Sequence, residues 1–207
     1  MGPLSCLDDP SVLLVADTSV VINLNATGCA ADILDALPNR LAIVDVARSE
    51  LEVGRDRGRS DSQLTEVLVR SKRITLVSLG AIGLGHFEGL VVGAAAETLD
   101  DGEAATLAYA LERGGTVIID ERKALRICAT RFAKLATAST LDILGHPEVF
   151  KALGANQLAE AVFLALQDAR MRVFDNHIPW VVALIGHERA ATCPSLPRSA
   201  RKSAGHK

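Results

Sequence analysis

Short apolar runs of strand length alternate with longer helical patterns along this chain, and this alternation limits the folds open to it. The clearest runs are "SVLLVA" (11–16), "RLAIVD" (40–45) and "TVIID" (116–120). Each is apolar at nearly every position, as expected for a strand covered on both faces, and a helical pattern follows each one. The sequence therefore predicts an α/β fold, in which a mainly parallel sheet lies between two layers of helices.

Two further strands are predicted in "ITLVSL" and "KLATAS", and a break near 25–28 divides the first helical region into two helices. We expect a main domain over 11–150. An amphipathic helix at 155–170 and a shorter apolar helix within 177–186 form a C-terminal helical extension over 151–189. Residues 190–207 lack apolar periodicity and are rich in Pro, Ser, Arg and Lys, so a disordered basic tail is predicted there.

Composition sets the class of protein. With 207 residues and 49% hydrophobic content, the chain can bury a full core. The net charge of -3 provides no overall positive field, so a nucleic-acid substrate would need local basic residues. The four cysteines form no C-x-x-C pair, which favours free thiols in a reducing compartment. The sequence shows no export signal or convincing membrane span, and we expect a cytoplasmic protein.

Acidic residues stand where predicted strands end. Asp17 follows the first strand and Asp120 ends the strand at 116–120, while Glu103 lies in the first turn of the helix before that strand. Glu50 lies on the predicted helix after the second strand. In open α/β sheets ligands bind beyond the carboxyl ends of the strands, so we expect these four carboxylates to meet at one edge of the sheet.

Each acid also has a purely structural explanation. Asp17 and Asp120 could cap the helices that follow them. Asp100 followed by Glu103 has the form of a capping box, which would account for that glutamate by itself. Glu50 could be an ordinary solvated helix residue. Only the combination, with four acids in a particular order on particular elements, favours a functional site.

That combination resembles a PIN-domain ribonuclease over roughly residues 12–150. The segments that carry the resemblance are "ADTSVVINL", "SEL", "LDDGEA" and "IIDERKALR", and they are most similar to a VapC-like branch with a "GEA" acidic motif. The resemblance implies a PIN-like three-layer α/β/α fold and Mg²⁺ or Mn²⁺ bound by four catalytic acids. Carried over by position, these acids are Asp17, Glu50, Glu103 and Asp120.

Neighbouring residues are candidates for contacts around the ion. They are Thr18, Ser19, Glu121 and Thr140, the last being the hydroxyl of the family's final motif with Ser139 beside it. Many such proteins have a second aspartate after the strand aspartate. Here Glu121 stands in its place, either as an outer ligand or as a first-turn helix acid favoured by the helix dipole. Glu52 lies on a different side of its helix from Glu50, so only one of the two should reach the site.

The chemistry fits the residues themselves. Hard divalent cations bind oxygen ligands, and Mg²⁺ uses one or two carboxylates together with water and substrate phosphate. Clustered carboxylates repel one another unless a cation or proton intervenes. A bound ion would polarise the scissile phosphate and lower the pKa of a bound water, so hydrolysis needs no covalent nucleophile.

Substrate binding would depend on local positive charge. The candidates for contact with RNA phosphates are Arg55, Arg57 and Arg59 in the loop after the second helix, and Arg122, Lys123 and Arg126 after Asp120. The alternative is that both groups form solvated faces. Few aromatic residues are present, so the sequence indicates no row of stacking platforms for base recognition.

The predicted function is metal-dependent endoribonucleolytic cleavage of RNA, in the family context as the toxin of a toxin–antitoxin pair or in housekeeping RNA processing. The alternative is a catalytically inactive PIN-like module that binds RNA or protein. Candidate protein partners are a small antitoxin and a second copy of the chain. A haloacid-dehalogenase-type phosphatase is disfavoured because Ser19 stands where its second aspartate is needed, and a receiver domain because the first strand ends in Asp17 alone.

Overall fold

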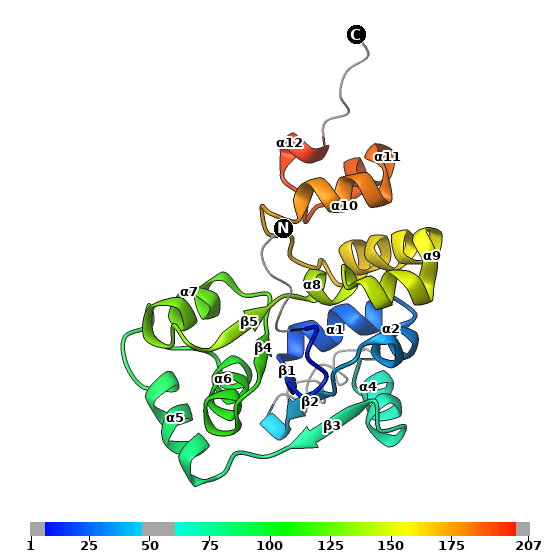
Figure 1. The fold of residues 1–207 in the computed structure, drawn as a ribbon. Coiled ribbons are helices and arrows are strands. Elements are labelled where there is room, and N and C mark those ends of the chain that lie inside the picture. The colour runs from blue at the N-terminus through cyan, green and yellow to red at the C-terminus, as the bar shows by residue number, and fades with distance from the viewer. Residues whose placement is uncertain (1–6, 47–60, 202–207) are drawn as a thin grey trace.

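The computed structural model describes residues 7–46 and 61–201 (Figure 1). Its centre is a five-stranded parallel sheet with the strand order β3-β2-β1-β4-β5. This confirms the predicted α/β class with a parallel sheet. The strands are β1 (Leu14–Ala16), β2 (Leu41–Val44), β3 (Ile74–Val77), β4 (Thr116–Ile118) and β5 (Ala136–Ala138).

The order of the strands contains one reversal. From β1 the chain builds outward through β2 to β3, and it then returns to place β4 on the other side of β1. Ala16 at the end of β1 is in register with Ile118 at the end of β4. The crevice beyond such a reversal is the usual ligand position in open α/β sheets. The fold therefore directs attention to the residues that follow β1 and β4.

Side chains of each strand alternate between two hydrophobic cores. Leu14 and Ala16 of β1 lie in one core, whereas Val15 between them lies in the other. This follows from the twofold side-chain period of a strand, and burial on both faces explains why the strands read as continuous apolar runs. Both helical layers predicted from the sequence are therefore present.

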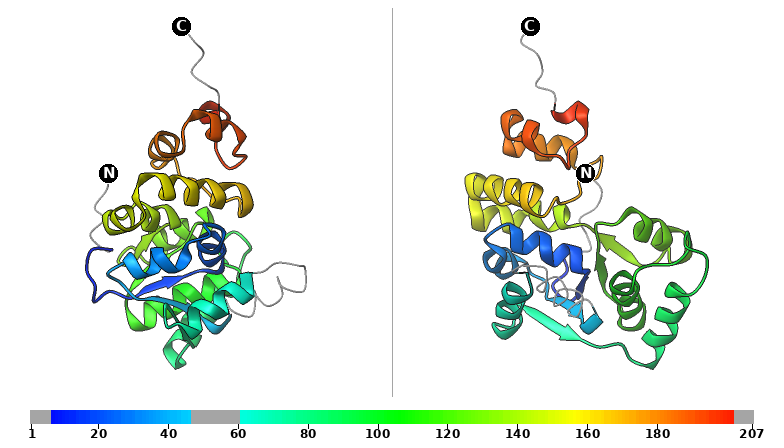
Figure 2. Two further views of the ribbon diagram at one scale, coloured as in Figure 1. Left: turned by 90° about the vertical axis from the view of Figure 1, so that its right-hand side faces the viewer. Right: turned by 180° about the vertical axis from the view of Figure 1, so that it is seen from behind.

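The helices separate into two layers, which Figures 1 and 2 show on opposite sides of the sheet. The core with Leu14 is covered by α1 (Thr18–Ala26), α2 (Ala30–Ala36), α4 (Asp61–Arg70), α8 (Thr140–Leu144) and α9 (Pro147–Asp168). The core with Val15 is covered by α5 (Ala81–Val91), α6 (Asp101–Arg113) and α7 (Arg122–Arg131).

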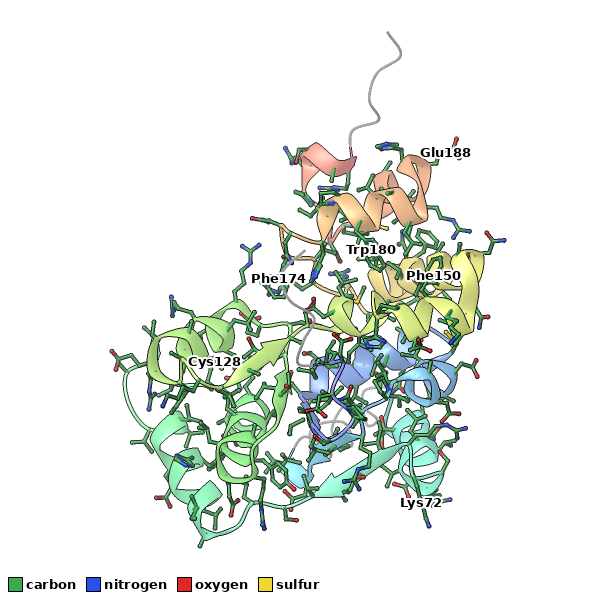
Figure 3. The ribbon with its side chains drawn as sticks, viewed as in Figure 1. Lys72, Cys128, Phe150, Phe174, Trp180 and Glu188 are labelled. Atoms are coloured by element: carbon green, nitrogen blue, oxygen red, sulfur yellow. The ribbon has the colours of Figure 1, made fainter. Side chains whose placement is uncertain are left out.

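The C-terminal helices stack on the first layer (Figure 2). The element α9 consists of two helices that meet in a kink at Gly154, whose φ of 71° is left-handed, and the second of them, over 155–168, corresponds to the helix expected at 155–170. The next helix, α10 (Ile178–Ile185), packs on α9, and Trp180 lies against the core of the first layer (Figure 3).

The prediction of a disordered tail is wrong for residues 190–201. This segment contains the end of α11 (His187–Thr192) and α12 (Arg198–Arg201), joined by a short turn. Cys193 and Leu196 are buried in the core of the first layer, and Gln167 of α9 donates hydrogen bonds to the carbonyl and hydroxyl of Thr192. Sequence periodicity missed this segment because only Ala190, Cys193 and Leu196 are buried in it, and Pro194 and Pro197 interrupt the helical pattern.

Two of the expectations from composition can be compared with the structure. Cys29, Cys128 and Cys193 are free thiols, and Cys6 lies outside the described residues. One helix in the described ranges, α9, is long and apolar enough to cross a membrane by length and composition. This indication is weak, because core helices of soluble proteins pass the same test.

Candidate active site

Asp17 directly follows β1 and is the N-cap of α1. Its Oδ2 accepts hydrogen bonds from the Ser19 backbone N–H at 3.1 Å and from the Ser19 hydroxyl at 2.7 Å. Its own backbone N–H donates to the Ile118 carbonyl at 3.1 Å, which ties the end of β1 to the end of β4. The capping explanation for Asp17 is therefore correct, and the same contacts fix the carboxylate at the edge of the sheet.

Asp120 follows β4 and does not cap the next helix. Glu121 is the N-cap of α7 instead, and accepts from the Lys123 backbone N–H. Asp120 reaches across to α8, where its Oδ1 accepts from the Thr140 backbone N–H at 2.9 Å and its Oδ2 from the Thr140 hydroxyl. The Asn23 amide of α1 donates to the same Oδ2 at 2.7 Å. Asp120 is thus held by two elements distant in the sequence, a network that a helix cap does not require.

Glu103 lies in the first turn of α6. The N-cap of that helix, Asp100, makes no side-chain capping bond, so the two-way capping box predicted from the sequence is incomplete. Burial raises the pKa of Glu103 to about 7, helped by the negative charges of Asp17 and Asp100, while a hydrogen bond from the Asp100 backbone opposes the rise. Glu103 is therefore a carboxyl group that changes charge close to neutral pH.

One pocket of about 200 Å³ brings three predicted acids together. Its lining contains Asp17, Glu103 and Asp120, together with Ser19, Asn23, Glu121 and the segment 169–172. Asp17 and Asp120 are each only 5% exposed. Burial raises the pKa of both, the charge of Asp17 raises that of Asp120 further, and hydrogen bonds to the carboxylates oppose these effects. The acids thus share one cramped environment in which their negative charges repel.

The oxygen donors of Asp17 and Asp120 fit a hard divalent cation that takes only part of its ligands from the protein. Within residues 7–46 and 61–201, no three His, Cys, Asp or Glu side chains are grouped closely enough to hold an ion among themselves. Mg²⁺ is commonly bound through one or two carboxylates and completes its shell with water and substrate oxygen. Asp17 and Asp120, buried beside each other's charge, are suited to that mode. Glu50, the fourth predicted acid, lies outside the described residues.

The structure also adds residues that sequence reasoning missed. Asn23 is buried on α1, where a polar residue within an otherwise apolar helix was a usable signal. Arg170 and Arg172 come from the segment after α9, and the Nη2 of Arg172 lies 3.0 Å from the Oε2 of Glu121. No local pattern links these arginines to Asp120, so the sequence held no comparable signal for them.

The predicted RNA-contacting residues either do not line the acidic pocket or fall outside the described residues. Arg55, Arg57 and Arg59 are not among the described residues. Arg122, Lys123 and Arg126 of α7 do not line the acidic pocket. Arg126 donates to the Ala96 carbonyl and so holds the loop after α5, and Arg122 lies 3.8 Å from exposed Asp175.

Of the hydroxyl residues predicted near the ion, two bond to the pocket acids and one caps a helix. Thr140 bonds to Asp120 and Ser19 bonds to Asp17, whereas Ser139 caps α8 in a two-way capping box with Asp142. Thr18 contributes a backbone hydrogen bond to the Asp17 carboxylate.

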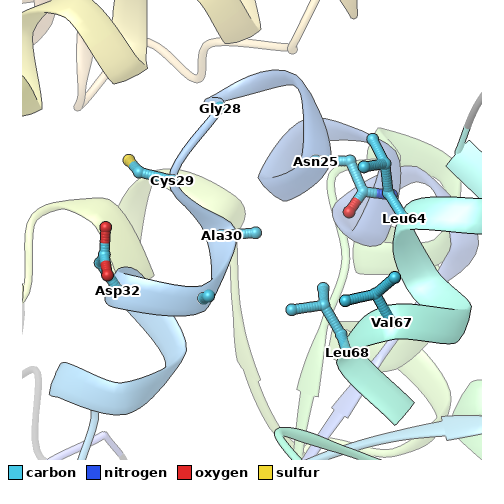
Figure 4. Close-up of a pocket in the computed structure, with 9 residues that line it drawn as sticks. Asn25, Gly28, Cys29, Ala30, Asp32, Leu64, Val67 and Leu68 are labelled. Atoms are coloured by element: carbon cyan, nitrogen blue, oxygen red, sulfur yellow. The ribbon is translucent and has the colours of Figure 1, made fainter. Parts of the chain in front are cut away.

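A larger pocket, of about 300 Å³, lies between α1, α2 and α4 (Figure 4). Its lining is mainly apolar, with Leu64, Val67 and Leu68 on α4 facing Ala30 on α2. None of the predicted site residues within 7–46 and 61–201 lines it. We place the candidate active site in the smaller acidic pocket, because chemistry depends on the groups that line a cavity more than on its size.

Comparison with known proteins identifies the family of the chain. The family model DUF3368, described as a PIN domain, matches residues 13–187. The matched range includes the acidic pocket and the segment 169–172, and it extends into the helices that the sequence analysis assigned to a separate extension. Comparison with curated proteins and with solved structures gave no match. The chain belongs to the PIN-domain family, which is generally one of nucleases.

Proposed function

We propose that this protein is a metal-dependent endoribonuclease that hydrolyses phosphodiester bonds in RNA. One observation carries the proposal: Asp17, Glu103 and Asp120, which are far apart in the sequence, line a single pocket beyond the carboxyl ends of β1 and β4. In a PIN-domain chain, that position and that chemistry support phosphoryl transfer to water.

Mg²⁺ or Mn²⁺, when bound, would polarise the scissile phosphate and acidify a water molecule. Asp17 and Asp120 are the residues that would hold the ion, because their hydrogen bonds to Ser19, Asn23 and Thr140 fix both carboxylates in place. Ordered carboxylates need little reorganisation when the reaction begins.

Glu103 is best matched to proton transfer. With a pKa of about 7 its carboxylate oxygen can accept a proton at neutral pH and release it again, which is the property of an efficient general base. We assign it the proton of the attacking water. Glu50 is proposed as the fourth acid on the family resemblance alone.

The biological setting is part of the proposal. We place the protein in the cytoplasm with RNA as its substrate, as a candidate toxin with an antitoxin partner. Housekeeping RNA processing is the competing role, and self-association into a homodimer is a further expectation.

The alternative function, an inactive RNA- or protein-binding module, is favoured by one observation. The acids already have structural duties, since Asp17 caps α1 and Asp120 joins α1 to α8. A pocket built only for stability would retain these contacts without any reaction.

A cleavage assay separates the two functions. Labelled single-stranded RNA is incubated with the protein and Mg²⁺, Mn²⁺ or EDTA, and Asp17→Asn, Asp120→Asn and Glu103→Gln are compared with Asp101→Asn. Asp101 is an exposed acid on the same helix as Glu103 and outside the pocket. We expect cleavage only with a divalent ion, and a loss of at least about a hundredfold in the three pocket variants.

The Asp101→Asn control should retain wild-type activity. Cleavage that persists unchanged in Asp17→Asn and Asp120→Asn would contradict the assignment. RNA binding without cleavage in any metal would favour the inactive module.

A further inference from the structure

The described lining of the acidic pocket has more acidic than basic side chains. Four of the described lining residues are acidic, namely Asp17, Glu103, Asp120 and Glu121. An RNA phosphate entering this pocket would be repelled at short range by Asp17, Asp120, Glu121 and the charged fraction of Glu103, and a single divalent ion offsets only two of these charges. The cationic side chains among the described lining residues are Arg170 and Arg172.

Both arginines lie in the short segment that follows α9. The helix α9 ends at Asp168, and Arg170 adopts a left-handed conformation with a φ of 54°. The chain then alternates, with Met171 and Val173 buried in the core and Arg170 and Arg172 exposed. Both arginines line the acidic pocket, together with Ala169 and Met171 of the same segment.

Ion pairs fix this segment against α7. Arg172 of this segment lies 3.0 Å from Glu121, and Arg122 of α7 lies 3.8 Å from Asp175 of the segment. A guanidinium carries five N–H donors, and the Glu121 contact occupies one of those on Arg172. Donors remain that could engage a phosphate in a bidentate manner.

The backbone at Arg170 is itself unusual. The left-handed conformation is unfavourable for residues other than glycine, asparagine and aspartate. An arginine at this position therefore lowers the free energy of unfolding relative to a glycine. Arg170 is exposed, so core packing does not account for the arginine side chain. The left-handed conformation belongs to the end of α9, as it does for Lys72 after α4, and what distinguishes Arg170 is its place in the lining of the acidic pocket.

We propose that Arg170 and Arg172 bind the phosphates of the RNA backbone at the mouth of the acidic pocket, and so position the scissile bond. This inference rests on the proposed function and assigns a substrate-binding role to the segment after α9. Both arginines act on the substrate as positioning residues.

The test measures RNA binding without cleavage. A fluorescent single-stranded RNA is titrated in EDTA over a series of salt concentrations, with the wild type, Arg170→Gln, Arg172→Gln and the control Arg113→Gln. Arg113 is an exposed arginine at the far end of α6 from Glu103 and does not line the pocket. We expect about a tenfold loss of affinity in each pocket variant. The slope of log K against log salt should fall by about 0.7 for each phosphate contact removed.

Two further variants separate binding from folding. Arg170→Gly keeps the backbone conformation and relieves its strain, so its melting temperature should not fall while its RNA affinity does. Glu121→Gln breaks the ion pair but keeps Arg172, so its RNA affinity should equal or exceed that of the wild type. If the ion pair alone mattered, Glu121→Gln and Arg172→Gln would weaken binding equally.

The outcomes are distinct. Wild-type affinity in both arginine variants, an equal loss in Arg113→Gln, an equal loss in Glu121→Gln, or absence of RNA binding by the wild type would each overturn the inference. Cleavage by the wild type under Mg²⁺ or Mn²⁺ that is unaffected or accelerated by the arginine variants would also overturn it while sustaining the proposed function. Arginine-dependent binding with no cleavage in any metal would sustain the RNA contact and overturn the nuclease.

Discussion

Replacing Glu103 with glutamine should make the protein more stable at alkaline pH. The pKa of Glu103 is raised from an ordinary value of 4.5 to about 7, first by burial and then by the charges of Asp17 and Asp100. Between these two values the folded state binds more protons than the unfolded state, so stability falls as the pH rises. Below about pH 4.5 the glutamate is neutral in both states and resembles glutamine.

The size of the effect follows from the same values. At 1.36 kcal/mol per pH unit, the difference between 4.5 and about 7 sets an upper limit of about 3.4 kcal/mol. Glu103 is only partly buried, and solvent screening reduces this limit to about 1–2 kcal/mol. We therefore expect Glu103→Gln to exceed the wild type by about 1–2 kcal/mol at pH 8, and by much less at pH 5.

Urea unfolding in EDTA at pH 5 and pH 8 measures this difference directly. Glu88→Gln, on an exposed position of α5, is the matched control and should follow the wild type at both pH values. Added Mg²⁺ should then stabilise the wild type more than Glu103→Gln, because the negative charge of Glu103 beside Asp17 strengthens the binding of a cation to the folded state. A Glu103→Gln variant no more stable than the wild type at pH 8 would refute the reasoning that the pocket concentrates unfavourable charge.

Three other results are expected. Thr140→Val removes the hydroxyl that bonds to Asp120, and should weaken Mg²⁺-dependent cleavage by about 10- to 100-fold in a metal titration. Leu196→Ala should lower the free energy of unfolding by about 2–5 kcal/mol, because this leucine is only 1% exposed in the segment expected to be disordered. Its control is Leu84→Ala, at an exposed leucine. An equally small effect of both substitutions would show that residues 190–201 are not packed. Cys128 should resist a thiol reagent at pH 8 until the protein unfolds, since burial raises its pKa to about 11; rapid modification of the native protein at Cys128, identified by mass spectrometry, would contradict this.

Local patterns in the sequence were sufficient for the elements and for three of the acids. Strand burial on both faces produces apolar runs that are visible without any structure, and the position of Asp17 after β1 follows from where such a run ends. Glu103 was found from its place in a helix's first turn, and Asp120 from its place after a buried strand. The role of Glu50 and the loop arginines remains a prediction, since they lie outside the described residues.

Tertiary structure decided which groups complete the pocket. Asn23 contacts Asp120 although 97 positions separate them, and Arg172 contacts Glu121 across 51 positions. It also decided that Asp120 bonds to α8 and does not cap α7, and that the segment around Leu196 is folded. The physical reason is that periodicity records which side of its own element a residue occupies. Which distant element faces that side depends on strand order and chain return, and these are fixed only when the whole core packs.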